Sequence, residues 1–387
     1  MINEFSKYLD QVPPSGIRAF FDLVENAKDI ISLGVGEPDF STPWFIRDEA
    51  IYALEKGYTT YTSNSGLLEL RKEISSYIDR RYGVIYKTES EILVTNGVSE
   101  AVDIIFRSIL NTGDEVILPK PMYVCYEPLI TLAGGVVKHC NMADTEFCPD
   151  PKRIEALITK KTKAIVLCYP HNPTGRSIPK SVLEEIAKIA DKHDVWVISD
   201  EIYAELQFEP GFVSFATLPK MKQRTVLLNG LSKSHAMTGW RVGFMCAPKA
   251  LVERCLKIHQ YAAMCVSTPS QYAAAEALKN GDASVTKMRT SYHQRARLFV
   301  DAMNDFGLET IMPEGGLYCF PDIRSTGLSS IEFATQLLES HRVAVVPGTA
   351  FGPEGEGYIR CCIATQLNDL MKAATKIGQF AKDTCDK

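Results

Sequence analysis

Seven short, mostly apolar runs lie between Ile92 and Ala247, and they limit what this chain can fold into more than any other feature. Most are apolar throughout rather than alternating, which is typical of strands buried on both faces. Helical stretches separate most of them, including residues 99–110 and 180–193. Such alternation predicts an α/β fold with a mainly parallel sheet. The predicted strands are residues 92–95, 115–118, 136–140, 164–168, 195–199, 225–229 and 243–246.

A second domain is expected in the C-terminal part of the chain. The 387 residues exceed what one hydrophobic core usually holds. Beyond about Lys287 the pattern changes to α+β, with a long helix through Tyr292 and Phe299 and then short apolar runs. Hydrophobic residues make up 45% and charged residues 23% of the chain, so both domains can bury ordinary cores.

Charge and hydropathy favour a small molecule as the partner. The net charge is -5 without a block of Lys and Arg, which argues against nucleic-acid binding. Neither an apolar signal-peptide core nor a run of about eighteen apolar residues is present, so we expect no membrane segment and a cytoplasmic location. The 11 cysteines form no C-x-x-C pair, so we expect reduced thiols and no metal site.

One lysine and one arginine suggest a cofactor site. Lys233 follows the predicted strand 225–229, and Arg241 lies eight residues later. The end of a parallel strand is where α/β folds place ligands. A lysine there can form an imine with an aldehyde cofactor, and an arginine nearby can grip its phosphate. Alone, this pattern is weak, because a solvated Lys and Arg in a loop would look the same.

Three further polar segments also follow predicted strands, at residues 95–99, 169–175 and 199–203. In the first, Gly97 precedes a helix whose free N–H groups could hold a phosphate. In the third, Asp200 directly follows the predicted strand 195–199, where it could also cap a helix. Four such segments at four strand ends predict one shared site.

With these segments the chain resembles the class I/II aminotransferases, a family of pyridoxal 5'-phosphate (PLP) enzymes of fold type I. Prokaryotic aspartate and aromatic amino acid aminotransferases are the subgroup that it resembles most. The resemblance runs from residues 31–40, Ile-Ser-Leu-Gly-Val-Gly-Glu-Pro-Asp-Phe, to the motif Tyr-Ile-Arg at residues 358–360. It implies a large domain, residues 45–286, with a mostly parallel seven-stranded sheet between helices. A small α+β domain would combine residues 1–44 and 287–387.

The resemblance also implies roles for the polar residues at the strand ends. Lys233 would hold the cofactor as an imine and, once displaced, move the substrate's α-proton. Asp200 would pair with the pyridine nitrogen. Tyr203 and Asn172 would donate to the ring oxygen, and the bond before Pro173 could be cis. The predicted catalytic residues are Lys233, Asp200 and Tyr203.

The predicted phosphate ligands are Gly97, Val98, Ser99, Ser232 and Arg241. Many relatives carry a serine three residues before the lysine, but this chain has Gly230, which leaves the number of phosphate contacts open. His235 lies two residues after Lys233 and is not included in the site.

Four more positions match family residues around the cofactor and substrate. Tyr123 would stack on the cofactor ring, although ordinary packing under a loop is an alternative. Tyr61 would reach across a dimer interface to the neighbour's phosphate. Arg360 would bind the substrate's α-carboxylate as a fork. Gly36 and Asn172 would line the same substrate site, with Gly36 allowing close backbone approach.

The expected activity is therefore PLP-dependent transamination. The amino group of an L-amino acid, aromatic or acidic, would move to a 2-oxo acid such as 2-oxoglutarate in a ping-pong cycle, within a homodimer that shares its active sites. A carbon–sulfur β-lyase is the alternative, because it would use the same Lys233, Asp200 and Arg360. A PLP-sensing regulator is a remote alternative, because such proteins place a DNA-binding module before this fold, whereas here the fold is expected to begin almost at Met1 with no basic helix before it.

Overall fold

The central sheet has seven strands in the order β2-β8-β7-β6-β5-β3-β4. The computed structural model describes residues 6–14, 16 and 29–385. Strands β4, β3, β5, β6 and β7 are parallel neighbours, and β8 runs antiparallel to β7 and β2. The predicted mostly parallel sheet is confirmed. Its strands are β2 (Ile92–Thr95), β3 (Glu115–Lys120), β4 (Val136–Asn141), β5 (Thr162–Cys168), β6 (Trp196–Asp200), β7 (Thr225–Gly230) and β8 (Gly243–Cys246).

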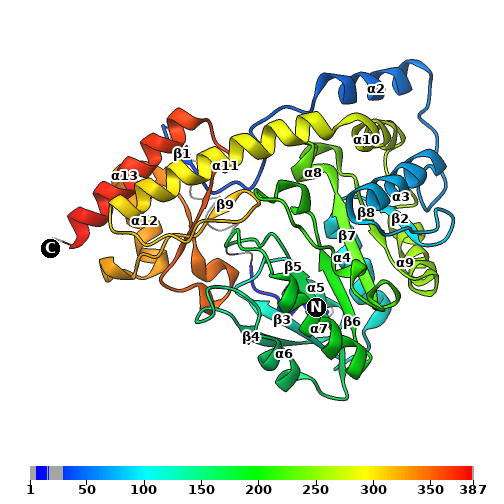
Figure 1. Cartoon of the computed structure of the whole chain (residues 1–387), viewed down its shortest axis with the longest axis horizontal. Helices are drawn as coiled ribbons and strands as arrows, with labels where there is room; N and C mark the ends of the chain where they lie inside the picture. Colours follow the sequence, from blue (N-terminus) through cyan, green and yellow to red (C-terminus); the bar gives the residue numbers. More distant parts are fainter. Residues whose placement is uncertain (1–5, 15, 17–28, 386–387) are drawn as a thin grey trace, which may run out of the picture.

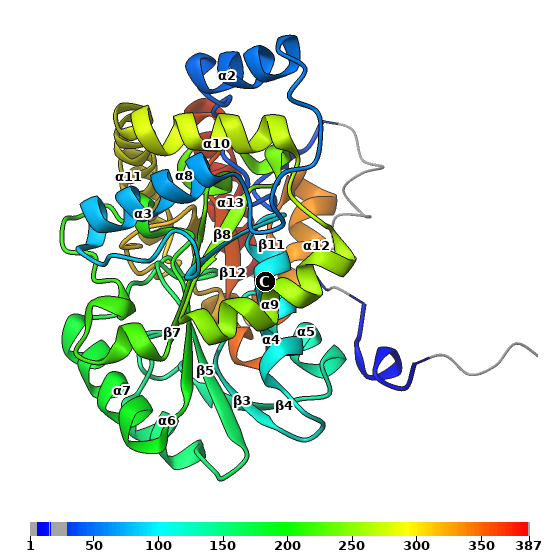
Figure 2. The ribbon, with the colours of Figure 1, turned by 90° about the vertical axis from the view of Figure 1, so that its right-hand side faces the viewer.

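Helices cover both faces of this sheet (Figure 2). Helices α4, α5 and α9 pack on one face in a single hydrophobic cluster, and α6 and α7 pack on the opposite face in another. The helices are α2 (Trp44–Glu55), α3 (Leu68–Tyr82), α4 (Val98–Ile109), α5 (Tyr126–Leu132), α6 (Pro151–Leu157), α7 (Lys180–His193), α8 (Leu231–Ser234), α9 (Lys249–Ala262), α10 (Thr268–Asn280), α11 (Asp282–Asp305), α12 (Ser330–His341) and α13 (Leu367–Cys385).

Helix α7 shows how the sequence pattern produces this layer. Its buried residues include Leu183, Ile186, Ala187 and Ala190, which share one face of a helix with 3.6 residues per turn. That face packs on a cluster that includes strand residues of β5 and β6. The helix ends as Asp194 adopts the left-handed conformation, with its N–H donating to the carbonyl of Ala190.

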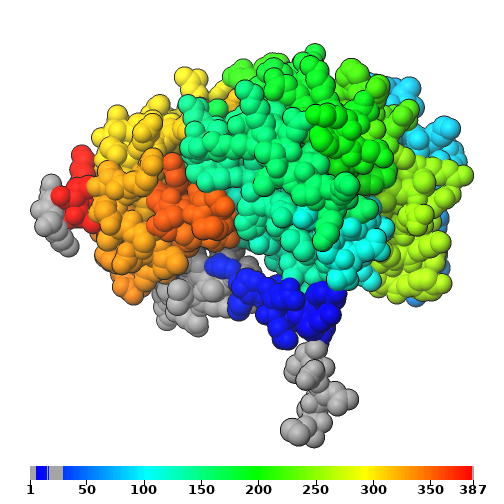
Figure 3. Space-filling view, turned by 90° about the horizontal axis from the view of Figure 1, so that it is seen from below, coloured from blue at the N-terminus to red at the C-terminus, as the bar shows by residue number. Residues whose placement is uncertain are grey.

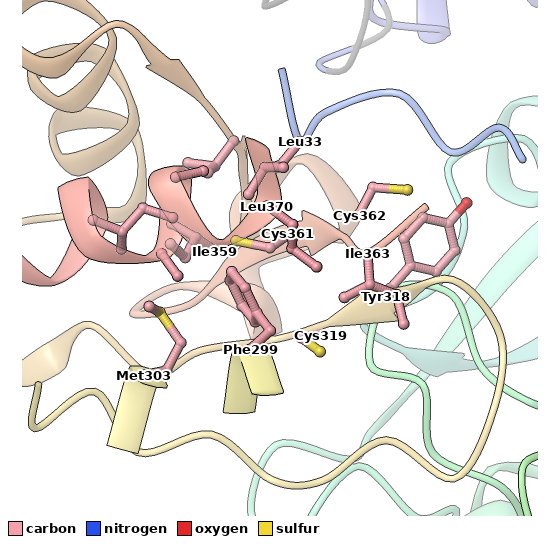
Figure 4. Packing of buried hydrophobic residues seen from close by; sticks show 14 of the residues in the cluster. Leu33, Phe299, Met303, Tyr318, Cys319, Ile359, Cys361, Cys362, Ile363 and Leu370 are labelled. Atoms are coloured by element: carbon pink, nitrogen blue, oxygen red, sulfur yellow. The ribbon is translucent and has the colours of Figure 1, made fainter. Parts of the chain in front are cut away.

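The C-terminal part has its own hydrophobic cluster around three helices (Figures 1 and 4). The long helix α11 crosses the molecule, and α12 and α13 pack beside short strands. Segments far apart in the sequence meet here, because Ile31 pairs in register with Val343. The short strands are β1 (Ile31–Ser32), β9 (Tyr318–Cys319), β10 (Val343–Ala344), β11 (Val346–Pro347) and β12 (Ile359–Cys362).

The division into two domains stays a prediction. In the space-filling view, the orange and red residues form one end of the molecule (Figure 3). Helix α11 begins at Asp282, so a boundary at residue 287 would fall inside this helix. Of the expected N-terminal contribution, residues 1–5, 15 and 17–28 lie outside the described part of the chain.

Candidate active site

A cavity of about 520 Å³ lies at the carboxyl ends of β5, β6 and β7, where the central sheet faces β9 and β12. This edge of a parallel sheet is the usual ligand site of α/β proteins. Eleven of the predicted site residues line this cavity: Gly36, Val98, Ser99, Tyr123, Asn172, Asp200, Tyr203, Ser232, Lys233, Arg241 and Arg360.

Lys233 lies in the one-turn helix α8, directly after β7. Its Nζ donates a hydrogen bond to the carbonyl of Gly36 at 2.5 Å, across the cavity from its own strand. Burial lowers the pKa of Lys233 to about 8, and the nearby positive charges of Arg360 and Arg241 also lower it. A much larger share of the amine is therefore uncharged near neutral pH than in an exposed lysine, as a nucleophile requires.

Asp200 is the last residue of β6 and is 5% exposed. The hydroxyl of Tyr126 donates to its Oδ2 at 2.5 Å, and the N–H of Ile202 donates to its Oδ1 at 3.2 Å. Burial raises the pKa of Asp200 to about 6, and these two hydrogen bonds act against that rise. No described helix begins at Glu201, so the helix-capping interpretation of Asp200 is wrong.

The start of α4 and the side chain of Arg241 form a cradle for an anion. Gly97 precedes the helix with φ of +77°, and the guanidinium of Arg241 lies so close that a Cβ at Gly97 would collide with it. Arg241 donates to the carbonyls of Thr238 at 3.0 Å and Asn96 at 3.4 Å, which fixes its direction. Free N–H groups at a helix start, together with a guanidinium, favour a phosphate.

Gly230 has a packing explanation. A Cβ at this position would lie 3.1 Å from both the Cα of Gly243 and the carbonyl oxygen of Val242. A serine there would have to push β7 away from β8, so the local backbone spacing favours glycine. Ser232 lines the cavity and is the hydroxyl that the sequence predicted near the lysine.

Arg360 extends from β12 and is 2% exposed. Its Nη1 donates to the Oδ1 of Asn172 at 3.0 Å, and its Nη2 donates to the carbonyl of Gly34 at 2.6 Å. Its Nε is buried without a hydrogen-bond partner among the described residues. A buried, unpaired donor beside an open cavity suits a carboxylate ligand. The Asn172–Pro173 bond is cis, as the resemblance suggested.

Tyr203 and Tyr123 approach the cavity from different elements. The hydroxyl of Tyr203 lies 2.9 Å from the hydroxyl of Tyr318, which belongs to β9. The ring of Tyr123 meets the ring of Tyr126 edge-on, with centroids 6.1 Å apart. Both predicted tyrosines therefore have packing partners as well as access to the cavity.

Tyr61 and His235 lie outside the cavity lining. Tyr61 is 76% exposed and lies beside a separate depression formed with residues 265–269. His235 is buried, and its Nδ1 lies 2.8 Å from the Oγ of Ser234. The role of Tyr61 stays a prediction, and so does the exclusion of His235 from the site.

Sequence reasoning missed several residues of the cavity, among them Tyr126, Tyr318, Cys168 and Glu37. Tyr126 is the first residue of α5, whereas Tyr123 lies in the loop before it, so no local spacing marks Tyr126 as a site residue. Cys168 pairs in register with Asp200, which sheet topology alone reveals. Tyr318 comes from a different sheet, and no local motif marks it.

The fold and the cavity define an α/β enzyme with a lysine amine at the centre of its site. The chain belongs to the aminotransferase class I and II family, whose model matches residues 28–377. It is 50% identical to the YugH protein of Bacillus subtilis (strain 168), over 99% of this chain and 100% of that protein. It is 41% identical to the aspartate aminotransferase of Pyrococcus abyssi, over 98% of this chain and 98% of that enzyme.

A solved structure agrees with these sequence relatives. The aromatic aminotransferase from Pyrococcus horikoshii OT3 superposes with a TM-score of 0.90 and 41% identity, over 94% of this chain and 99% of that chain. The protein is therefore an aminotransferase with the fold of this family, as the sequence predicted. The β-lyase alternative is not favoured.

Proposed function

We propose that this aminotransferase binds PLP and moves the amino group of an L-amino acid to a 2-oxo acid. The observation that carries the proposal is the combination in one cavity of a lysine with a lowered pKa, a buried carboxylate, an anion cradle and an arginine with an unpaired donor. Each of these groups matches a different part of an amino acid joined to a pyridine aldehyde phosphate.

The residues present fit this cofactor. The helix start at Val98 and Ser99, with Arg241, would hold the phosphate. Asp200 would hold the proton on the ring nitrogen, because it is a buried acceptor already oriented by Tyr126. Tyr203 and Asn172 would donate to the ring oxygen. Asn172 accepts from Arg360 through its Oδ1, which leaves its amide NH₂ as a donor.

The protein's own side chains would have different tasks in the proposed reaction. When bound, the cofactor supplies an aldehyde that joins amines and a ring that accepts the electron pair left by the α-proton. The Nζ of Lys233 would hold the cofactor at rest and carry the α-proton once the substrate has displaced it. Arg360 would fork onto the α-carboxylate and so fix which Cα bond faces Lys233. The same groups serve both halves of a ping-pong cycle.

Acidic and aromatic donors are the proposed substrates, with 2-oxoglutarate as acceptor, because relatives are named for aspartate and for aromatic amino acids. Mixing the PLP-loaded protein with single L-amino acids, without any 2-oxo acid, should convert its cofactor to the aminated form. Stopped-flow absorbance reports this conversion for each donor. Pyruvate formation with the starting absorbance retained would contradict transamination and indicate a lyase.

We also propose a homodimer that shares its active sites. Large apolar side chains are exposed on α2 and on the loops that follow it, including Trp44 at 61% and Tyr61 at 76%. The loop beside Tyr61 is tied to α10, because the Oγ1 of Thr268 donates to the carbonyl of Thr60 at 2.7 Å. Exposed apolar surface of this kind favours association.

Subunit mixing tests the shared site. Tyr61→Ala and Lys233→Ala should each be strongly impaired, yet a mixed dimer contains one site in which both residues are native. Random reassociation should therefore restore roughly a quarter of native activity. Light scattering should report about twice the chain mass of 43.0 kDa. Activity that never exceeds the sum of the two variants would contradict sharing.

We propose a cytoplasmic location. Burial raises the pKa of several thiols, including Cys168 and Cys246, so these cysteines stay protonated and unreactive. All 11 cysteines are free thiols in the structure, which suits a reducing compartment. Within the described part of the chain, no helix is both long and apolar enough to cross a membrane.

A further inference from the structure

Tyr318 contacts three groups of the candidate site, although no sequence motif marks the strand to which it belongs. It lies on β9, is 2% exposed, and pairs in register with Cys362 on β12, two residues after Arg360. Figure 4 shows its ring at the edge of the C-terminal hydrophobic cluster, with the hydroxyl directed away from Phe299 and Met303. The polar end of this side chain is therefore available to the cavity.

The ring of Tyr318 supports the arginine. The guanidinium carbon of Arg360 lies 4.4 Å from the centre of this ring and 4.8 Å from the centre of the Phe351 ring. A buried guanidinium over an aromatic face is attracted by the ring's negative face. The two rings therefore hold the Arg360 fork in place while its Nε stays free for a ligand.

The hydroxyl of Tyr318 reaches the tyrosine on the opposite side. It lies 2.9 Å from the hydroxyl of Tyr203, and the two rings meet at 75° with centroids 5.8 Å apart. Each hydroxyl has one proton, so only one of them can donate in this bond. If Tyr318 donates, the proton of Tyr203 remains free for another acceptor. The neighbouring cation of Arg360 favours Tyr318 as the donor, because a positive charge makes a phenol more acidic.

The glycine loop is shaped around the same hydroxyl. A Cβ at Gly36 would collide with the Tyr318 hydroxyl, so only glycine leaves room for it. The carbonyl of Gly36 accepts from Lys233, and the carbonyl of Gly34 accepts from Arg360. Tyr318 therefore packs against the loop that orients both cationic side chains.

We propose that Tyr318 is a positioning residue that links Arg360 to Tyr203. Its ring holds the carboxylate-binding guanidinium, and its hydroxyl donates to Tyr203 so that the Tyr203 proton is directed to the ring oxygen of PLP. The inference rests on the proposed function of the site. It assigns two separable tasks to one side chain, and Tyr318→Phe removes only the second.

The first test is an absorbance titration of the PLP-loaded protein against pH, without substrate. A hydrogen-bond donor to the ring oxygen stabilises the deprotonated form of the lysine-linked cofactor. Tyr318→Phe should weaken this donor and so raise the midpoint pH of that deprotonation by about half to one pH unit. Tyr203→Phe should raise it further. The double variant should match Tyr203→Phe alone, because Tyr318 acts through Tyr203. An unchanged midpoint in Tyr318→Phe would overturn the proposed link between Tyr318 and Tyr203. So would a double variant in which the midpoint shifts of the two single variants add in full.

The second test measures the dissociation constant of 3-phenylpropionate, an unreactive carboxylate, by its effect on the cofactor absorbance. Tyr318→Phe should bind within about twofold of native, and Tyr318→Leu should bind about tenfold more weakly. Tyr318→Met, which fills a similar volume without a ring, serves if the leucine variant does not fold. Native affinity in the ring-less variant would overturn the support of Arg360. A native protein that forms no lysine-linked absorbance band would instead refute the proposed function.

Discussion

Replacing Lys233 with alanine should abolish the visible absorbance of the lysine-linked cofactor and lower kcat by roughly 10⁴-fold or more. The reason is that one amine has two tasks. It holds the cofactor at rest, and it carries the α-proton once freed. The Nζ of Lys233 donates to Gly36 at 2.5 Å, and its lowered pKa of about 8 suits both tasks. The absorbance spectrum of the reconstituted protein and steady-state kinetics with the best donor measure the two losses separately.

Lys372→Ala is the matched control, because the side chain of Lys372 is 67% exposed on α13, a helix that contributes no residue to the cavity lining. It should keep both the band and the turnover. Lys233→Arg is a second variant that retains a positive charge but forms no such linkage. A Lys233→Ala protein that keeps the band and native turnover would remove this residue from the catalytic role.

The strands and the strand-end residues could be predicted because they follow from local sequence. Apolar runs without alternation indicate buried parallel strands, and the structure places them within a few residues of the prediction. Lys233, Asp200 and Gly97 each follow or end such a run, and parallel strands bring their carboxyl ends together. The topology of the sheet then brings together side chains that the sequence shows only in separate segments.

The remaining parts depend on contacts between distant elements. Tyr126 donates to Asp200 across 74 positions in the sequence, and Tyr318 meets Tyr203 across 115. Nothing in the local pattern distinguishes these tyrosines from core residues, because both are buried and both pack against apolar neighbours. Arg360 was predicted only because its motif resembles a family motif. The physical reason for its position, an aromatic support from two elements, became visible in the structure.

The specificity for the substrate side chain was not predictable for the same reason. The cavity residues with positive charge are Lys233, Arg241 and Arg360. Each of these already has a proposed ligand, so a distal carboxylate would need a partner outside the described lining of this chain. The proposed second subunit is one source of such a group. The preference for amino acid donors should therefore be measured alongside the subunit-mixing experiment.

Replacing Asp200 with asparagine should lower kcat by roughly 100- to 1000-fold and weaken cofactor retention. Asparagine keeps the shape and can still accept from Tyr126, but it supplies no negative charge to hold a proton on the ring nitrogen. Transient kinetics with a single donor should show that the α-proton transfer, rather than amino acid binding, is slowed. Asp369→Asn on the exposed start of α13 is the matched control and should remain near native.

The pH dependence of cofactor retention gives this prediction a second measurement. Burial raises the pKa of Asp200 to about 6 in the cofactor-free protein. As the pH falls through about 6, the carboxylate gains a proton and loses the charge that attracts a protonated ring, so native retention should weaken there. The Asp200→Asn protein lacks this titrating carboxyl group, so it should bind the cofactor weakly at every pH and show no change in retention near pH 6. Dialysis followed by fluorescence of the retained cofactor, between about pH 5 and 7, measures both. Native-like kcat, or an unchanged transition in the asparagine variant, would show that another group holds the ring nitrogen.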